Sequence, residues 1–134
     1  MKLINTYTYE IKKSKFIGYY YEIDNKDEVK EIIDGLKKEH SKAKHFPYAY
    51  LLPNTAGKSD DGEPNNTCGL PIYNLLERKG LTNRLIVVVR YFGVTKLGAG
   101  NLLRSYIKAA TDSINEWYVK HMYKLNFFLN NFCT

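Results

Sequence analysis

The segment KSDDGEPNNTCGLPI, residues 58–72, gathers three carboxylates, two glycines and two prolines between two apolar stretches. Asp60, Asp61 and Glu63 lie close enough in sequence to share a hard cation such as Mg²⁺, with phosphate and water completing the shell. Asp side chains also close turns by accepting hydrogen bonds from nearby backbone N–H groups. We favour this second role, in which the acids shape a loop, and we assign no metal ion to it.

The segment RYFGVTKLGAGNLLR, residues 90–104, contains three glycines before an apolar helical pattern. Glycines let backbone N–H groups face outward, and the start of a helix adds positive partial charge, so this turn suits an anion. Lys96 would add a mobile charge, and Asn101, Arg104 and Lys108 fall along one side of the predicted helix. The alternative is a tight strand-to-helix turn followed by a solvated polar face.

Nucleophilic catalysis has weak support. Cys68 and His45 are the residue types of a thiol nucleophile and its base, but their separation in sequence predicts no contact. His45 is most simply a histidine at the start of a strand. We therefore assign no catalytic residue and no cofactor, and an enzyme is the less favoured class. The two cysteines, Cys68 and Cys133, and the absence of an apolar leader predict a cytoplasmic protein.

Periodicity predicts the elements that hold these segments. Residues 6–11 and 16–23 are rich in aromatic and β-branched side chains on either side of a basic turn, which predicts a β-hairpin. Residues 24–40 and 98–117 repeat apolar side chains every three or four positions, which is typical of amphipathic helices. The continuous apolar run over residues 84–92 predicts a central strand.

Two further elements lie beside the acidic loop. Residues 45–52 predict a strand that lies at an edge or begins after Pro47. Residues 69–80 predict a short helix with Pro71 near its start and Gly80 just past its end. The order ββαβαβα predicts an α+β two-layer sandwich, with a mostly antiparallel four-stranded sheet and helices on one face. We expect one domain over residues 1–118 and a C-terminal tail over residues 119–134.

Charge is unevenly distributed along the chain. The formal net charge is +6, and residues 78–134 hold nine Lys or Arg against two Asp or Glu. A basic field favours polyanions such as RNA or an acidic protein surface, although many basic proteins use it for solubility alone. No apolar run reaches the length of a membrane span, so we expect no membrane partner.

Taken together, the motifs resemble those of the YigZ/IMPACT family. The segments KSKF, AKHFPYAY, SDDGEPNNTCGLPI and RYFGVTKLGAGNLLRSY occur in that family's order and spacing, from about Ser14 to Tyr106. The resemblance implies a fold like those of a small-subunit ribosomal protein, the ribonuclease P protein and domain IV of elongation factor G. Eukaryotic members regulate translation by binding the ribosome-associated activator of a starvation-response kinase, and nucleic-acid binding is suspected for bacterial members.

The family pattern also indicates differences. Val94 stands where the family usually has a second glycine, Asn66 where a small residue is common, and Cys68 where alanine is usual. Bacterial relatives commonly carry a second, smaller ferredoxin-like domain, which we expect to be absent here. The loop residues that match the family signature are Ser59, Asp60, Asp61, Gly62, Glu63, Pro64, Thr67 and Gly69.

The expected function is that of a cytoplasmic, translation-associated binding module that contacts RNA, the ribosome or a regulatory protein through a basic face. The candidate contact residues are Lys15, His45, Arg90, Lys96, Gly98, Gly100, Asn101, Arg104 and Lys108. The alternative is a small phosphate- or nucleotide-dependent enzyme, in which the glycine-rich turn over residues 93–100 holds phosphate and the Asp60, Asp61 and Glu63 loop holds Mg²⁺. In the first case we expect the loop acids to pair with Arg90 or Arg104.

Overall fold

The computed structural model describes the backbone of residues 1–93 and 97–132 and the side chains of residues 1–93 and 97–115. Val94 and Lys96 lie outside the described residues. The elements are β1 (Lys2–Ile11), β2 (Ser14–Glu22), α1 (Lys26–Glu39), β3 (Tyr48–Leu51), β4 (Ala56–Ser59), α2 (Gly69–Arg78), β5 (Arg84–Tyr91) and α3 (Ala99–Phe132).

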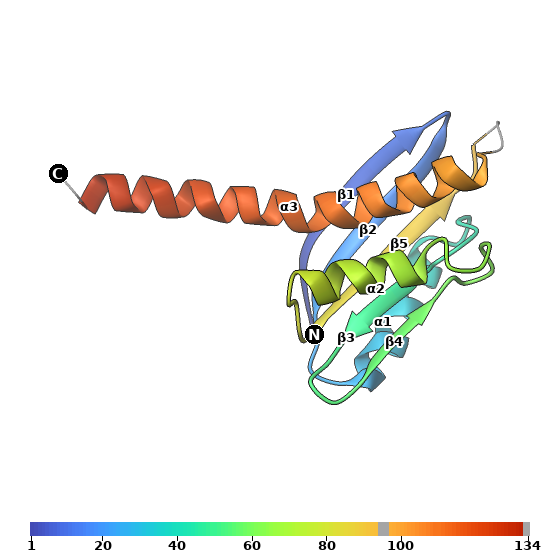
Figure 1. Cartoon of the computed structure of the whole chain (residues 1–134), viewed down its shortest axis with the longest axis horizontal. Coiled ribbons are helices and arrows are strands. Elements are labelled where there is room, and N and C mark those ends of the chain that lie inside the picture. Colours follow the sequence, from blue (N-terminus) through green and yellow to red (C-terminus); the bar gives the residue numbers. More distant parts are fainter. Residues whose placement is uncertain (94–96, 133–134) are drawn as a thin grey trace.

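The strands form one sheet in the order β1-β2-β5-β3-β4, and every neighbouring pair is antiparallel (Figure 1). The apolar run predicted as a central strand is β5, the third of the five strands. Its side chains are buried without interruption from Leu85 to Arg90. A strand with both faces covered needs such a continuous run, so the sequence pattern and the position in the sheet agree.

The helices cover both faces of the sheet. Ile86 and Val88 of β5 pack in one core with Ile72 of α2 and Tyr106 of α3. Leu85, Val87 and Val89 pack in the other core with residues of α1 such as Ile33. Figure 1 accordingly shows α2 and α3 in front of the sheet and α1 behind it. The expectation of helices on one face was wrong, because a strand buried on both sides requires a helix on each.

The α+β class and the mostly antiparallel sheet are confirmed, as is the N-terminal hairpin. The sheet has five strands instead of four, because the short β4 was not predicted and the order becomes ββαββαβα. The sequence of β4, AGKS, lacks β-branched and aromatic residues. A Cβ atom at Gly57 would lie 2.5 Å from the ring of Tyr50 on β3, so glycine at this position leaves room for that ring.

The helix ends follow local rules. The side chain of Asn25 accepts a hydrogen bond from the N–H of Glu28 and caps α1. Gly80 has a φ of 62° just past the end of α2, where the left-handed conformation favours glycine. Helix α3 continues through Phe132 and extends beyond the sheet in Figure 1. Among the described residues, no helix combines the length and apolar character that a membrane crossing requires.

Candidate functional site

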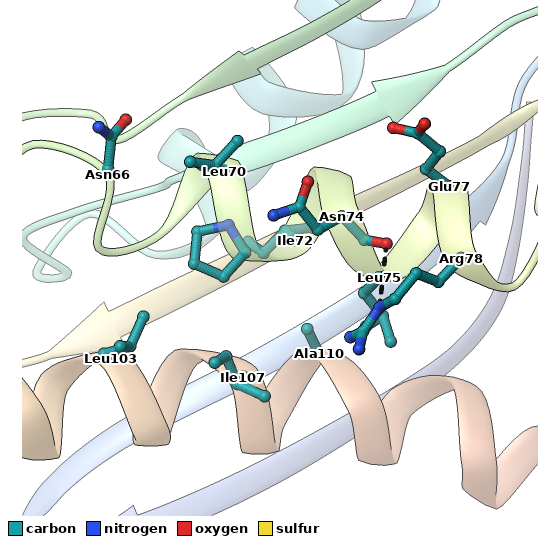
Figure 2. A pocket seen from close by; sticks show the side chains of 11 residues that line it. Asn66, Leu70, Ile72, Asn74, Leu75, Glu77, Arg78, Leu103, Ile107 and Ala110 are labelled. Atoms are coloured by element: carbon teal, nitrogen blue, oxygen red, sulfur yellow. Dashed lines mark hydrogen bonds between the residues drawn. The ribbon is translucent and has the colours of Figure 1, made fainter.

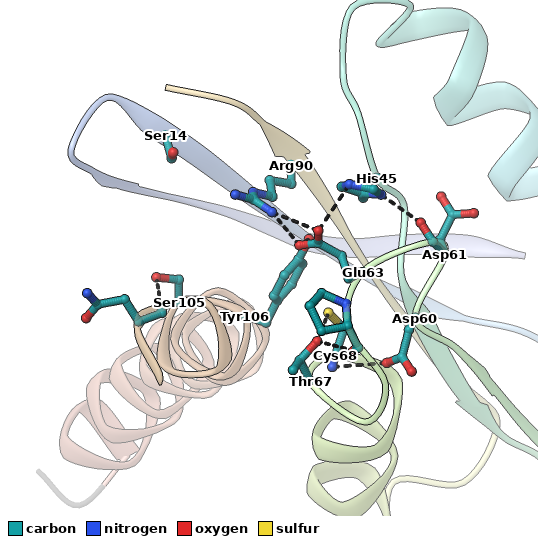
Figure 3. A network of polar contacts seen from close by, with 12 residues as sticks. Ser14, His45, Asp60, Asp61, Glu63, Thr67, Cys68, Arg90, Ser105 and Tyr106 are labelled. Atoms are coloured by element: carbon teal, nitrogen blue, oxygen red, sulfur yellow. Dashed lines mark hydrogen bonds and ion pairs between the residues drawn. The ribbon is translucent and has the colours of Figure 1, made fainter. Parts of the chain in front are cut away.

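A buried ion pair joins the acidic loop to the central strand. The Nη1 of Arg90 donates to both carboxylate oxygens of Glu63, at 2.8 and 2.6 Å. The exposed fractions of the two residues are only 6% and 9%. Tyr106 of α3 donates its hydroxyl to Glu63 Oε2 at 2.6 Å, and His45 Nε2 lies 3.1 Å from Oε1 (Figure 3). Arg90 and Tyr106 together donate three hydrogen bonds to the carboxylate of Glu63, and these offset the cost of burying its charge.

The sheet and α3 hold Arg90 in place. Arg90 lies opposite Phe16 of β2 in the strand register, and its guanidinium carbon is 5.6 Å from the centre of that ring. Tyr106 packs edge-on against Phe16, with 5.0 Å between ring centres. Burial raises the pKa of the Tyr106 hydroxyl, and the hydrogen bond to Glu63 raises it further. Tyr106 therefore stays a neutral hydroxyl that donates to the carboxylate of Glu63.

His45 links the loop to the sheet through both its backbone and its ring. Its carbonyl accepts from the N–H of Arg90 at 3.0 Å, which forms an isolated bridge beside β5. Its Nδ1 lies 2.7 Å from the carbonyl oxygen of Asp61, and its Nε2 faces the carboxylate of Glu63. Both neighbours only accept, so both contacts are hydrogen bonds only when each ring nitrogen carries a proton. Gly62 follows with a φ of 85°, a conformation that glycine adopts without strain.

The other two acids of the loop hold backbone groups. Asp60 accepts from the N–H groups of Asn66, Cys68 and Gly69, at 2.9, 3.1 and 2.9 Å, and so closes the loop onto the start of α2. Burial pushes the pKa of Asp60 upward, but these N–H donors and Lys58 lower it below its ordinary value. Asp61 accepts from the N–H of Phe46 at 2.7 Å. Both carboxylates shape the chain around them.

The remaining signature residues complete the same loop. The hydroxyl of Ser59 accepts from the N–H of Asp61 at 3.0 Å, and Thr67 donates to the carbonyl of Pro64 at 2.5 Å. A Cβ atom at Gly69 would lie 3.0 Å from the backbone of Ser59, so α2 begins in close contact with the end of β4. Among the described residues, no group of three His, Cys, Asp or Glu is arranged to hold a metal ion.

The predicted contact residues of α3 are only partly brought together. Gly98 and Gly100 are exposed at the start of the helix. Arg104 bends back toward this end and donates to the side-chain oxygen of Asn101 at 2.8 Å. Lys108 instead pairs with Asp112 at 2.7 Å, one turn further along. The predicted row of three donors is therefore split, and Lys96 lies outside the described residues.

A basic surface surrounds the end of β5, and of its residues the sequence analysis named only Lys15 and Arg104. Lys12 and Lys13 form the turn between β1 and β2, and this turn packs on Gly93, whose N–H donates to Ser14 Oγ at 3.0 Å. A Cβ atom at Gly93 would lie 2.5 Å from the backbone of Lys13 and of Ser14. The clue in the sequence was KKSK, a basic turn placed between two strands.

Two more lysines lie near the end of β5. Lys15 Nζ is 4.9 Å from the centre of the Tyr91 ring, and the N–H of Lys44 donates to the carbonyl of Arg90 at 2.9 Å. Figure 1 shows the β1–β2 turn, the end of β5 and the start of α3 at one end of the molecule. We call this surface the basic end, and its residues are Lys12, Lys13, Lys15, Lys44, Phe92 and Arg104.

A separate groove lies between α2 and α3 (Figure 2). Its volume is about 720 Å³, and apolar side chains such as Leu70, Leu103 and Ile107 line it together with polar residues of α2. Arg78 donates to the carbonyl of Asn74 within this wall. The groove shares no lining residue with the ion pair of Glu63 and Arg90 or with the basic end.

The protein is an α+β domain in which a buried ion pair between Glu63 and Arg90 joins the signature loop to the central strand. The chain matches the family model described as the Impact N-terminal domain over residues 12–114, and it belongs to this family. The resemblance to the YigZ/IMPACT family is thus confirmed. His45, Glu63, Arg90 and Tyr106 all lie within the matched residues.

Curated relatives carry the same family name. The IMPACT family member YvyE of Bacillus subtilis (strain 168) is 38% identical over 108 residues, which are 78% of this chain and 50% of that protein. The IMPACT family member YigZ of Escherichia coli (strain K12) is 37% identical over 102 residues, 72% of this chain and 50% of that protein. The chain therefore spans about half the length of the curated relatives it matches.

Two solved structures share the fold. A crystal structure of a hypothetical protein is 33% identical, with a TM-score of 0.79, and the match covers 83% of this chain and 56% of that one. A structure of the two-domain translational regulator Yih1 is 20% identical, with a TM-score of 0.50, covering 84% of this chain and 46% of that one. At this identity the second likeness shows the fold alone.

Proposed function

We propose that this domain is a cytoplasmic RNA-binding module and that the basic end is its RNA contact surface. Its translation-associated role is part of the same proposal and rests on family membership. The observation that carries the proposal is the conformation of Lys12 and Lys13. Both have positive φ, 48° and 64°, at the two central positions of a two-residue hairpin turn.

Those two positions are usually filled by Asn, Asp or Gly, because such turns require the left-handed conformation. Placing an ordinary residue there costs about 1 kcal/mol or more per residue. Two adjacent lysines at a strained turn are thus a poor choice for stability alone. Strain of this kind concentrates where a side chain has another task, and two exposed positive charges at a hairpin tip suit contact with a phosphate backbone.

The neighbouring charges support the same function. Lys15 and Lys44 add positive charge around the end of β5, and Glu10, opposite Lys15 in the register, is an exposed acid beside Lys15. The carboxylate of Glu63 is buried against Arg90 and does not face the surface. The charge of Glu63 is therefore offset by Arg90 and does little to cancel the field of the lysines.

The enzyme alternative has less support. Holding Mg²⁺ with Glu63 would require the carboxylate to leave Arg90 and Tyr106. Removing one partner from a buried ion pair is strongly destabilising. Asp60 and Asp61 would likewise have to release the backbone N–H groups that they hold.

Fluorescence anisotropy with a labelled RNA oligonucleotide tests the proposal. We expect log Kd to rise linearly with log salt concentration between 50 and 200 mM, because bound lysines release counterions. Lys13→Glu and Arg104→Glu should each weaken binding several-fold and lower the salt slope by about 1. Lys79→Glu, an exposed residue next to the C-terminal end of α2, is the charge-matched control. Binding that neither Lys13→Glu nor Arg104→Glu weakens more than Lys79→Glu does, or that shows no salt slope, would overturn the proposal.

Cosedimentation of tagged protein with ribosomes tests the translation-associated part. We expect wild type and Lys79→Glu to pellet with ribosomes at low salt and Lys13→Glu to stay largely in the supernatant. If the ribosomes are treated with nuclease before mixing, the wild-type protein should also stay in the supernatant. If Lys13→Glu and Lys79→Glu pellet with ribosomes equally, and nuclease has no effect, the contact is with a ribosomal protein and not with RNA.

A further inference from the structure

Phe92 is the most exposed large hydrophobic side chain in residues 1–93 and 97–115, with 54% of its surface accessible. It follows the last residue of β5, in the middle of the basic end. An exposed phenylalanine alone is common on protein surfaces. The packing around this one distinguishes it.

The ring of Phe92 packs against a charged side chain and an aromatic side chain of its own domain. The guanidinium carbon of Arg90 lies 4.5 Å from the centre of the ring, and His45 meets it edge-on at 5.9 Å between centres. Arg90 is itself fixed by Glu63, and the ring of Phe16 lies 5.6 Å from the same guanidinium. A guanidinium against one face leaves the other face and the outer edge as the exposed part of the ring.

This arrangement is an exposed aromatic surface that packs against Arg90 and His45 and is bordered by positive charge. An immobile ring loses little entropy when a flat partner stacks on it. Lysines lie on both sides of the strand end, from the β1–β2 turn and from Lys44. Aromatic rings beside lysines are the usual way in which proteins bind single-stranded nucleic acid, because an unpaired base stacks while the phosphates meet the cations.

We propose that Phe92 stacks on an unpaired base, so that the basic end selects single-stranded RNA over a duplex. The inference rests on the proposed RNA binding and specifies its substrate class. In a duplex the bases are stacked on each other and present no free face to the ring. Phe92 would therefore contribute to the binding of a single strand and leave the binding of a duplex to the lysines.

The test compares a 12-nucleotide single strand with a duplex hairpin that carries a similar number of phosphates, at one salt concentration. Phe92→Ala and Phe92→Leu should weaken single-strand binding about tenfold and change duplex binding less than twofold. Phe92→Tyr, which keeps the ring, should retain wild-type affinity. Circular dichroism melting of each variant checks that the fold is intact, and a 2-aminopurine base in the strand should lose fluorescence on binding wild type but not Phe92→Leu.

The outcomes separate the two proposals. Wild-type protein that binds neither RNA would overturn the proposed function and this inference together. Protein that binds RNA in a salt-dependent manner, with equal affinity for both forms or with no effect of Phe92→Leu, would overturn the inference alone. A loss that is equal for single strand and duplex would also overturn it, because it would assign Phe92 a structural role.

Discussion

Glu63 and Arg90, 27 residues apart in sequence, form a buried ion pair in which one guanidinium nitrogen contacts both carboxylate oxygens. The pair ties the signature loop to the middle strand of the sheet. The same guanidinium lies against the exposed ring of Phe92. Arg90 thus contacts both the signature loop and the basic end.

Glu63→Gln should lower the free energy of unfolding by about 3–5 kcal/mol, because Arg90 would remain buried without an opposite charge. Urea unfolding followed by circular dichroism measures this. Glu31→Gln on the exposed face of α1 is the matched control and should change stability by less than about 0.5 kcal/mol. A loss below 1 kcal/mol for Glu63→Gln would mean that the pair contributes little to folding.

The carboxylate of Asp60 should make stability depend on pH. Its pKa is lowered in the folded chain, so the ionised group stabilises the fold above its ordinary value of about 4, and this contribution is lost as the pH falls through the lowered value. Asp60→Asn does not titrate. The gap in melting temperature between wild type and Asp60→Asn should therefore be largest near pH 6 and shrink toward pH 2.5. A gap that stays constant over this range would contradict the role of the three N–H donors.

Gly93→Ala should destabilise the fold, because a Cβ atom there would lie 2.5 Å from the backbone of the β1–β2 turn. Strands β2 and β5 would have to separate at this end, and we expect a melting temperature at least about 5 °C lower. Gly98→Ala is the matched control, since none of the residues that the structure describes lies within 4 Å of the added atom. Similar melting temperatures for the two variants would show that the turn does not pack on Gly93.

The thiol of Cys68 should be inert in the native protein. It is fully buried, and burial raises its pKa to about 12, so almost no thiolate exists at pH 8. Iodoacetamide labelling followed by peptide mapping reports on Cys68 separately from Cys133. We expect Cys68 to be unmodified after an hour in buffer and fully modified in urea. Rapid native labelling would reopen the possibility of thiol chemistry at the loop.

Much of the fold could be predicted from local patterns. The apolar periods of α1 and α3 and the run that became β5 are all short-range signals. The placement of helices is a long-range property, and it was predicted wrongly. The continuous apolar run of β5 indicated the correct placement of the helices. Six consecutive buried residues need cover on both faces of the sheet.

The site was predictable only in part. The sequence analysis named Arg90 and Arg104 as partners for the loop acids, and the structure pairs Glu63 with Arg90. The hydrogen bond from Tyr106 to Glu63 was not predicted, because a tyrosine within an apolar helical stripe is usually a packing residue. The strain at Lys12 and Lys13 was not predicted, because their positive φ angles cannot be read from the residue types.

The double variant Lys12→Asn/Lys13→Gly, measured for stability and RNA affinity in parallel, tests the central claim most directly. An Asn-Gly pair suits the left-handed turn, so the melting temperature should rise by about 3–6 °C while RNA affinity falls at least tenfold. Lys30→Gln/Lys79→Gln removes the same charge from exposed positions on α1 and next to the end of α2 and should lower affinity less than twofold. A more stable turn variant that binds RNA as well as wild type would contradict the account.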